Sequence, residues 1–476
     1  MNTKTTMIHY TPAQLAAIQT AMTANVSVIT GGPGTGKTTV LRGIIDKMEA
    51  KHLRYLLCAP TGRAQKRMTE QTRRPSQTIH RLLEWQGGKF GRDDDCPLRT
   101  DAVIVDECSM VDLLLMRALL RVITPGTRLI LIGDNDQLPS VGAGRVLGDT
   151  IESGAVPVTR LTQIYRQDEG SYITRNAQAI IHGNVGGLHL DNKTSRDFFF
   201  LDVGKLMEAG KYTLMPEIDS IDKAAQHELI EIVRDRLPSH MPGREIQVLT
   251  PTRQRGDCCC DVLNPLLQHA LNPDGQPLSL TNYRLRRGDR VMQQKNNYGL
   301  QVFNGDIGVV EGEGYADRKT DWHPQFLKRT KGMPSRYNIK SGEWEEYHTD
   351  DDKRLFVRYP DEHFATAYAS EELGALDLAY ASTIHKSQGS EYPVVVLMIT
   401  PATSHMLNRN LLYTAVTRAR ELCLIIGTRK ALDLAVRKVS TESRQTRLAE
   451  RLRNENDNDN RRDIPRRNAS LFCIQI

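Results

Sequence analysis

Residues 26–40 read VSVITGGPGTGKTTV, and this stretch decides the expected fold. The apolar run VSVI predicts a buried strand, and the segment after the glycines is compatible with a helix. The glycines let the backbone turn its N–H groups toward an anion at the start of that helix. Gly31, followed by four residues and then by Gly36, Lys37 and Thr38, has the spacing of a phosphate-binding loop. A turn with only a structural role would explain neither the lysine nor the threonine.

The loop defines candidate contacts for a nucleoside triphosphate and its metal ion. Lys37 is expected to reach the β and γ phosphates, and Thr38 to offer a hydroxyl to Mg²⁺. A second signal is VIVDECS, in which Asp106 and Glu107 follow an apolar run. Asp106 is expected to hold Mg²⁺ and Glu107 to orient or deprotonate the attacking water, so the chain is predicted to be a nucleoside triphosphatase. The candidate nucleotide-binding residues of the loop are Gly32, Pro33, Gly34, Thr35, Gly36, Lys37, Thr38 and Thr39.

Four further polar residues each have two interpretations. Gln14 stands three residues after Thr11, which is the spacing of a helix capping box, but its amide could also pair with an adenine edge. Gln137 in GDNDQLPSVGAG could sense the γ phosphate or belong to a turn. Arg166 and Arg418 could each donate a guanidinium to the transferring phosphoryl group from across an interlobe cleft, or form surface ion pairs.

The composition favours a globular, multidomain protein of the cell interior. A chain of 476 residues with 39% hydrophobic residues is long enough for about three domains. The net charge of +6 permits a polyanionic partner without requiring one. The eight cysteines lack metal-site or disulfide spacing, no apolar run approaches bilayer length, and the first residues lack a secretory core. We therefore expect a cytoplasmic protein that is neither exported nor membrane-embedded.

Two α/β lobes are expected, each built on a parallel sheet. Apolar strands alternate with helical stretches up to about residue 134, and a second series of strands follows between residues 245 and 428. Short strands around an Asn-Gly-Asp turn indicate a small β-barrel inserted into the second lobe. The polar stretch 314–352 is expected to be a long surface loop or a partly disordered excursion. The tail after Val439 is expected not to pack, although a basic element such as Arg461 and Arg462 could touch nucleic acid. The expected parts are lobe 1 (1–77 and 101–160), a hairpin insertion (78–100), lobe 2 (161–280 and 376–440), the barrel insertion (281–375) and a charged tail (441–476).

The ordered motifs resemble those of superfamily 1 helicases, and most closely the 5′→3′ branch of RecD-like and Dda-like DNA helicases. These motifs are the Gln motif around Gln14, the phosphate loop, APTGRA, TIHRLL, DECSM, GDNDQLPSVGAG, YRQ, ASTIHKSQGSE and YTAVTRA. The resemblance implies RecA-like lobes, an SH3-like barrel, and ATP and Mg²⁺ as cofactors. It also implies that Gln14 contacts adenine and that Glu391 lies near the nucleotide. The residues implied to complete the nucleotide site are Gln137, Arg166 and Arg418.

The same resemblance assigns a path for single-stranded DNA. Hydroxyls, backbone N–H groups and a few basic side chains would hold phosphates without reading bases. Residues 84–98 correspond to a strand-separating hairpin of the family, in which Trp85 or Phe90 could stack on the last base pair or form a small satellite core. The implied DNA contacts are Thr61, Gly62, Arg63, Thr78 and His80 in lobe 1 and Thr383, His385 and Gln388 in lobe 2.

The expected function is an ATP-dependent 5′→3′ DNA helicase that translocates on single-stranded DNA and unwinds duplex. The expected partners are single-stranded DNA and its junctions with duplex, with a single-strand-binding protein or other replication and repair proteins as candidates. One alternative is an RNA helicase, because phosphate contacts barely report the sugar. Another is a nucleic-acid-dependent ATPase subunit of a larger recombination or repair complex. A nuclease is disfavoured, since no second carboxylate cluster with a two-metal pattern stands outside the phosphate site.

Overall fold

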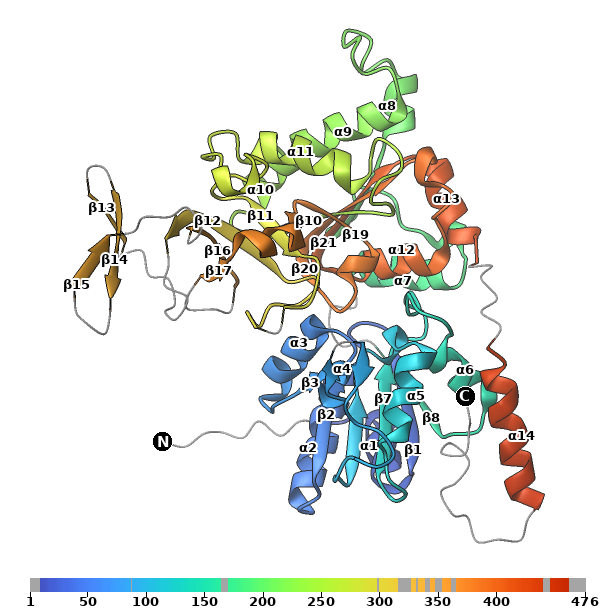
Figure 1. The fold of residues 1–476 in the computed structure, drawn as a ribbon. Coiled ribbons are helices and arrows are strands. Elements are labelled where there is room, and N and C mark those ends of the chain that lie inside the picture. The colour runs from blue at the N-terminus through green and yellow to red at the C-terminus, as the bar shows by residue number, and fades with distance from the viewer. Residues whose placement is uncertain are drawn as a thin grey trace, which may run out of the picture. The chain divides into compact units, whose positions relative to one another are not determined.

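The structure is a computed structural model, drawn as a ribbon in Figure 1. It describes residues 9–86, 88–163, 170–297, 299–315, 327–330, 333–338, 343–346, 353–360, 365–439 and 446–461. The chain divides into two compact units. As far as they are described, unit 1 comprises residues 1–187, 409–417 and 439–476, and unit 2 comprises residues 188–408 and 418–438.

Unit 1 is built on a six-stranded sheet in the order β3-β2-β6-β7-β1-β8. The strand expected before the phosphate loop is β1, and it pairs with β7 on one side and β8 on the other. Every neighbouring pair is parallel, so the carboxyl ends of the strands meet at one edge. This confirms the first expected parallel-sheet lobe. The strands are β1 (Val26–Gly31), β2 (Tyr55–Ala59), β3 (Gln77–Thr78), β6 (Ala102–Val105), β7 (Arg128–Gly133) and β8 (Val158–Leu161).

Both faces of this sheet are buried, because successive side chains of a strand point to opposite sides. On β7, Leu129 and Leu131 belong to one apolar core, whereas Ile130 and Ile132 belong to another. The core with Leu129 also receives α5 (Leu113–Arg121) and α6 (Val146–Ser153). The core with Ile130 receives α1 (Pro12–Thr23) and α2 (Lys37–Ala50). The other helices of unit 1 are α3 (Gly62–Thr72), α4 (Ile79–Leu82), α7 (Tyr172–Ile181), α12 (Arg409–Val416) and α14 (Leu448–Arg461).

A short antiparallel hairpin follows α4 in unit 1. It consists of β4 (Trp85–Gln86) and β5 (Lys89–Phe90), and Trp85 lies opposite Phe90. The expected hairpin insertion of lobe 1 is therefore present at the expected place.

Unit 2 contains a second parallel sheet, with five strands in the order β19-β10-β20-β21-β9. The central strand β20 is buried almost throughout and reads as a continuous apolar run, as strands covered on both faces do. This confirms the second parallel-sheet lobe. The strands are β9 (Phe198–Asp202), β10 (Ile246–Thr250), β19 (Ala381–Thr383), β20 (Tyr392–Ile399) and β21 (Ala419–Gly427). The helices are α8 (Val203–Glu208), α9 (Ile221–Glu231), α10 (Leu237–His240), α11 (Cys260–Leu271) and α13 (Arg429–Arg437).

The insertion in unit 2 is an antiparallel sheet with its own small apolar core. Its strand order is β17-β16-β12-β11-β18, and the two end strands do not pair among the described residues, so the expected barrel is an open sheet here. Three more strands form a separate antiparallel sheet where the charge-rich sequence predicts a loop (Figure 1). The strands are β11 (Arg290–Gln293), β12 (Ile307–Tyr315), β16 (Lys353–Arg358), β17 (Thr366–Tyr368) and β18 (Leu376–Leu378), then β13 (Leu327–Thr330), β14 (Met333–Asn338) and β15 (Glu343–Glu346).

The C-terminal tail differs from the expectation that it does not pack. Within it, α14 packs against α6, and Leu448 and Leu452 are buried in the core of unit 1. Thr446 donates a hydrogen bond to Asp149 over 2.9 Å and fixes the start of the helix. The sparse apolar residues of this charged segment are spaced four apart, which places both on one face of the helix.

The two units also differ from the expected lobe boundaries. Unit 1 continues to Gly187 and includes α12, although the sequence analysis assigns both segments to lobe 2. Among the described helices, none is both long and apolar enough to cross a membrane.

Candidate nucleotide and nucleic-acid sites

The phosphate loop joins β1 to α2 and exposes the start of that helix. Gly36 is the N-cap of α2 in a left-handed conformation, with φ of 86°, and no side chain caps the helix. The first N–H groups of α2 are therefore directed at the loop, together with the positive end of the helix dipole. Lys37 Nζ donates to the carbonyl oxygens of Gly31 at 2.6 Å and Gly32 at 2.9 Å. The ammonium is held at the loop, where phosphate oxygens would be stronger acceptors than these carbonyls.

Gln14 takes part in the capping box and also touches the phosphate loop. Its backbone N–H donates to the Thr11 hydroxyl over 3.2 Å, and its Oε1 accepts from the Thr11 N–H over 3.0 Å. A Cβ added to Gly36 would lie only 2.4 Å from Gln14 Nε2. The structure thus shows the capping box, in which the amide oxygen takes part, while the amide nitrogen faces the phosphate loop.

Asp106 and Glu107 follow directly on β6 at the carboxyl edge of the sheet. The Asp106 Oδ1 accepts from the Glu107 N–H at 2.8 Å, and Glu107 has a left-handed φ of 51°, which is uncommon for a residue with a side chain. Burial, followed by the charge of Glu107, raises the pKa of the Asp106 carboxyl to about 6, and the hydrogen bond from the Glu107 N–H and the charges of Lys37 and Arg67 oppose the shift. A nearby cation would stabilise its ionised form.

The oxygen donors at this edge fit a magnesium ion. Mg²⁺ prefers carboxylate and hydroxyl oxygens and usually keeps several waters. Asp106 supplies a carboxylate, and the Thr38 hydroxyl, which donates to Gln71 Oε1 at 3.2 Å, still has lone pairs for a cation. Gln71 has no counterpart in the sequence analysis, since nothing in the local sequence marks this glutamine at the end of α3.

Gln137 lies beside a buried carboxylate that the sequence analysis missed. Asp134 follows the last residue of β7 and is only 1% exposed. Gln137 Nε2 donates to Asp134 Oδ2 over 3.0 Å, and Asp134 Oδ1 accepts from the Asp136 N–H over 3.1 Å. Asp134 could have been identified from the sequence, because it directly follows an apolar strand, as Asp106 does.

The proposed DNA contacts of unit 1 lie at helix starts. Thr61 caps α3 by accepting from the Ala64 N–H at 3.2 Å, and Gly62 and Arg63 form the first turn of that helix. Thr78 caps α4 in the same way, from the Arg81 N–H at 3.2 Å. Their hydroxyls are therefore used by the fold, and the first turn of α3 directs backbone N–H groups outward.

His80 and the two hairpin aromatics form one aromatic cluster. The ring centroids of Trp85 and Phe90 are 4.5 Å apart, and His80 lies 5.9 Å from Trp85. Phe90 packs against the apolar core of unit 1, whereas Trp85 is 38% exposed. Burial lowers the pKa of His80, although the charge of Asp112 opposes the shift. Trp85 is thus the better placed of the two for contact with a base.

In unit 2, Thr383 lies at the wall of a cavity of about 360 Å³. Its hydroxyl accepts from the Lys386 N–H at 3.3 Å. The cavity wall also carries the cationic side chains of Arg253, Arg284 and Lys386, with Asp377 bonded to both arginines at 2.9 Å. His385 and Gln388 follow on the same segment, and Gln388 is 5% exposed.

Two of the remaining proposed nucleotide residues, Glu391 and Arg418, belong to unit 2. Arg418 is 2% exposed, and its guanidinium donates to the Ser390 carbonyl oxygen over 2.9 Å. Glu391 forms an ion pair with Arg420 at 3.6 Å. Arg166 lies outside the described residues.

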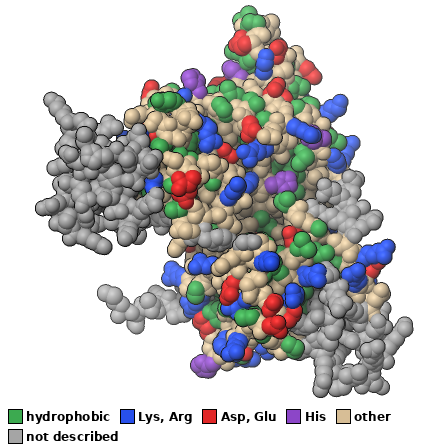
Figure 2. Space-filling model, in the orientation of Figure 1, with side chains coloured by type: hydrophobic (Ala, Val, Ile, Leu, Met, Phe, Trp, Pro, Cys, Tyr) green, Lys and Arg blue, Asp and Glu red, His purple; other side chains and the backbone are tan. Residues whose placement is uncertain are grey.

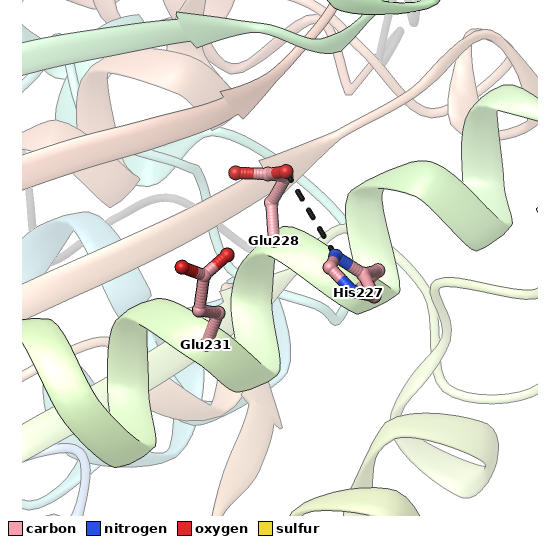
Figure 3. A group of neighbouring side chains, drawn as sticks. All are labelled: His227, Glu228 and Glu231. Carbon is pink, nitrogen blue, oxygen red and sulfur yellow. Dashed lines mark ion pairs between the residues drawn. The ribbon is translucent and has the colours of Figure 1, made fainter. Parts of the chain in front are cut away.

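A group on α9 has ligand atoms close enough for a metal ion but is already neutralised. Figure 3 shows His227, Glu228 and Glu231 on this helix, with ligand atoms within 4.8 Å of one another. Glu228 is fully buried and ion-paired to Lys211, and Glu231 is paired to Arg236 at 2.7 Å. The Tyr212 hydroxyl donates to Glu228 over 2.8 Å. Glu228 Oε2 and His227 Nδ1 have no hydrogen-bond partner among the described residues, but both carboxylates are already neutralised by basic side chains, so we assign the group as a structural ion-pair network.

On the face of the described residues drawn in Figure 2, charge does not single out a nucleic-acid path. Figure 2 shows blue Lys and Arg side chains on the visible face interspersed with red Asp and Glu side chains.

Three segments of the chain match known protein families. Residues 14–143 match an AAA domain, and residues 378–426 match a UvrD-like helicase C-terminal domain. Residues 263–321 match the SH3 domain of ATP-dependent RecD-like DNA helicases. The last match supports the SH3-like character of the insertion, whose described strands remain open.

Curated relatives match over most of the chain. The ATP-dependent RecD2 DNA helicase of Deinococcus radiodurans is 34% identical over 426 residues, which are 90% of this chain and 50% of that protein. The RecBCD enzyme subunit RecD of Mycobacterium tuberculosis is 30% identical over 451 residues, which are 89% of this chain and 70% of that protein. The chain thus spans half the length of the first relative. The Pif1 helicase of Candida albicans has a similar fold, with a TM-score of 0.52 and 20% identity over 95% of this chain and 100% of that chain.

Proposed function

The chain belongs to the RecD-like family of superfamily 1 DNA helicases, and on this premise we propose that it is an ATP-driven motor. The motor moves 5′→3′ along single-stranded DNA and unwinds the duplex ahead of it. One observation supports the proposal most strongly. Lys37, Asp106 and Gln137 come from three separate segments and follow β1, β6 and β7 at the carboxyl edge of one parallel sheet. This edge is where α/β proteins bind nucleotides.

Each residue of this edge has a proposed role in hydrolysis. Lys37 and the N–H groups of α2 bind the β and γ phosphates. Glu107 orients the attacking water and takes up its proton, and Gln137 responds to the γ phosphate. Thr38 and Asp106 would hold Mg²⁺, which when bound neutralises charge on the phosphates. Gln14 contacts adenine and Glu391 lies near the nucleotide, while the guanidinium donors are Arg166 and Arg418.

The proposed DNA track uses contacts that do not read sequence. In unit 1 these are the starts of α3 and α4, with Thr61 to Arg63 and then Thr78 and His80. In unit 2 they are Thr383, His385 and Gln388. Opening a duplex costs on the order of 1.4 kcal/mol per base-pair step, so one step per ATP is a small load.

The motor is tested first by its ATPase activity. Purified protein should hydrolyse ATP faster when single-stranded DNA is added. Lys37→Ala should abolish hydrolysis and retain strand binding, whereas Lys47→Ala, an exposed lysine on the same helix, should behave like the wild type. Hydrolysis that DNA does not accelerate, or that persists in Lys37→Ala, would contradict the proposal.

Polarity is tested with partial duplexes that carry either a 5′ or a 3′ single-stranded overhang. The proposed direction requires unwinding of the substrate with the 5′ overhang. A preference for the 3′ overhang would exclude the proposed branch.

Trp85→Ala should reduce unwinding more than DNA-stimulated hydrolysis, because an aromatic that separates strands is needed only at a junction. An equal loss of both activities would exclude Trp85 as the separating residue.

A second candidate is an ATPase subunit of a larger recombination or repair complex. The name of the mycobacterial relative, a subunit of the RecBCD enzyme, favours it. The isolated chain would then hydrolyse ATP with DNA but unwind only with partner proteins. Matched RNA and DNA oligonucleotides in the same assay would separate either candidate from an RNA helicase.

A further inference from the structure

Helix α12 carries a buried tyrosine whose hydroxyl lies next to the phosphate loop. Tyr413 is 2% exposed. A Cβ added to Gly32 would lie 2.9 Å from the Tyr413 hydroxyl, which is the one heavy atom of the described residues within 4 Å of it beyond the immediate chain neighbours. The glycine at position 32 therefore leaves room for this hydroxyl against the backbone of the phosphate loop.

The same hydroxyl donates to the carboxylate that holds Gln137. Tyr413 Oη donates to Asp134 Oδ2 over 3.1 Å, and Gln137 Nε2 donates to the same oxygen over 3.0 Å. Asp134 is 1% exposed, so both hydrogen bonds lie out of water, where a charged acceptor strengthens them. Tyr413, Asp134 and Gln137 thus form one connected group beside Gly32.

Two further hydrogen bonds fix α12 against the loop after β7. The Leu138 N–H donates to Thr414 Oγ1 over 2.9 Å, and Asn410 Nδ2 donates to the Asp136 carbonyl oxygen over 2.8 Å. Along the chain, α12 stands between β20 and β21, which belong to the sheet of unit 2, while α12 itself belongs to unit 1. The helix that orients this loop is therefore covalently continuous with both of those strands.

We propose that Tyr413 is a positioning residue for ATP hydrolysis, whose hydroxyl holds Asp134, and through it the Gln137 amide, in register with Gly32 of the phosphate loop. This inference rests on the proposed function and adds a residue to its nucleotide site. Binding of a diphosphate does not depend on the Tyr413 hydroxyl. The hydroxyl does determine the position of the Gln137 side chain when a γ phosphate is bound. Its loss should therefore affect the discrimination between diphosphate and triphosphate states more than nucleotide binding itself.

The test uses Tyr413→Phe in the full chain, which removes only the hydroxyl. Affinity for mant-ADP with Mg²⁺ is measured with and without beryllium fluoride, which mimics the γ phosphate. We expect affinity for mant-ADP alone within about twofold of wild type and a gain from beryllium fluoride about tenfold smaller, because a hydrogen bond to a charged group is lost. The kcat of DNA-stimulated hydrolysis should fall about tenfold, with a smaller change in KM.

The matched control is Tyr380→Phe. Tyr380 is also buried and donates to a carboxylate, that of Asp289, over 2.9 Å, but it lies in unit 2 among residues that the proposed mechanism does not use. This variant should keep the wild-type gain from beryllium fluoride. A double-mutant cycle of Tyr413→Phe with Gln137→Ala should be strongly non-additive, since the two side chains act through one oxygen.

Three outcomes decide the inference. An unchanged gain from beryllium fluoride in Tyr413→Phe, or additive effects in the cycle, overturns it and leaves the motor intact. A wild-type chain whose ATPase does not respond to DNA overturns the proposed function and this inference with it. Should Tyr413→Phe fail to fold, Asp134→Asn keeps the side-chain shape and must show the same loss of discrimination.

Discussion

Position 36 requires glycine for two reasons, the backbone conformation there and the close approach of the Gln14 side chain. Its φ of 86° is costly for any residue with a Cβ, and that Cβ would lie 2.4 Å from Gln14 Nε2. The phosphate loop and the Gln14 side chain are therefore close neighbours at this glycine. The sequence pattern requires a glycine here for the turn, and the structure adds the second reason.

We predict that Gly36→Ala weakens binding of Mg²⁺-ATP about tenfold or more, because both the loop and Gln14 must move. Gly126→Ala is the matched control, since Gly126 has a φ of 95° but no atom of the described part of the chain within 4 Å of an added Cβ. Both variants should lose about 1 kcal/mol of stability, and only Gly36→Ala should lose nucleotide affinity. Equal ATP affinity of the two variants in a fluorescence titration would contradict this account.

The Glu49 carboxylate links three segments of unit 1 through hydrogen bonds. It accepts from Arg74 Nε over 2.7 Å and from the Tyr55 hydroxyl over 2.6 Å, and thus joins α2 to β2 and to the turn after α3. The hydrogen bond from Arg74, followed by that from Tyr55, lowers the pKa of Glu49 to about 2. The Glu49 and Arg74 side chains are 39% and 40% exposed, so the stabilisation is screened and modest.

We predict that Glu49→Gln costs about 0.5–1 kcal/mol at pH 7. Because the folded pKa lies below the ordinary value of 4.5, the stabilisation is complete above about pH 4.5 and is lost as the pH falls toward 2. Urea denaturation at pH 7, 4 and 3 measures the difference between variant and wild type. A difference that stays constant down to pH 3 would show that ionisation of Glu49 is not its source.

At the scale of elements, α14 shows how two leucines bring a charged segment into a core. Leu452 is 2% exposed and Leu448 is 6% exposed, both in the core that also contains residues of α6. Arg453 adds a hydrogen bond to the Glu152 carbonyl oxygen over 3.1 Å. Composition favours a solvated tail, but one apolar face is enough for docking when a partner helix is present.

We predict that Leu452→Ala lowers the free energy of unfolding by about 2–4 kcal/mol, because it removes a buried side chain from a packed core. Arg451→Ala on the exposed face of the same helix should cost less than about 0.5 kcal/mol. Denaturant unfolding of both variants provides the measurement. Equal stability of the two would mean that α14 does not pack in solution as it does here.

At the scale of the whole molecule, neither unit is one continuous stretch of chain. The chain passes between the units after residues 187, 408, 417 and 438. Unit 1 therefore receives α12 and α14 from segments that follow most of unit 2 in sequence. Because of these crossings, truncating the chain at a unit boundary is expected to remove elements from one of the units.

We predict that a fragment of residues 1–187 is less stable than the full chain and exposes apolar surface, because it lacks α14 and α12. The buried residues Leu448 and Leu452, and the partners that α12 gives Asp134 and Leu138, would be missing. Thermal unfolding and binding of a hydrophobic dye, compared with the full chain, measure this. A monomeric fragment that unfolds at the same temperature as the full chain and binds no more dye would contradict it.

The sequence by itself determined the features that depend on residues close together in the chain. The phosphate loop, the carboxylates after β6 and the alternation of apolar strands and helices are encoded in short stretches, so both parallel sheets, the hairpin and Lys37 could be identified without coordinates. The tertiary structure alone decided what depends on residues far apart in the chain. Tyr413 meets Asp134 and Gly32 across gaps of hundreds of residues, α14 docks on α6, and the insertion sheet stays open among its described strands. No residue spacing in the sequence predicts such contacts, because packing and desolvation act between elements that only folding brings together.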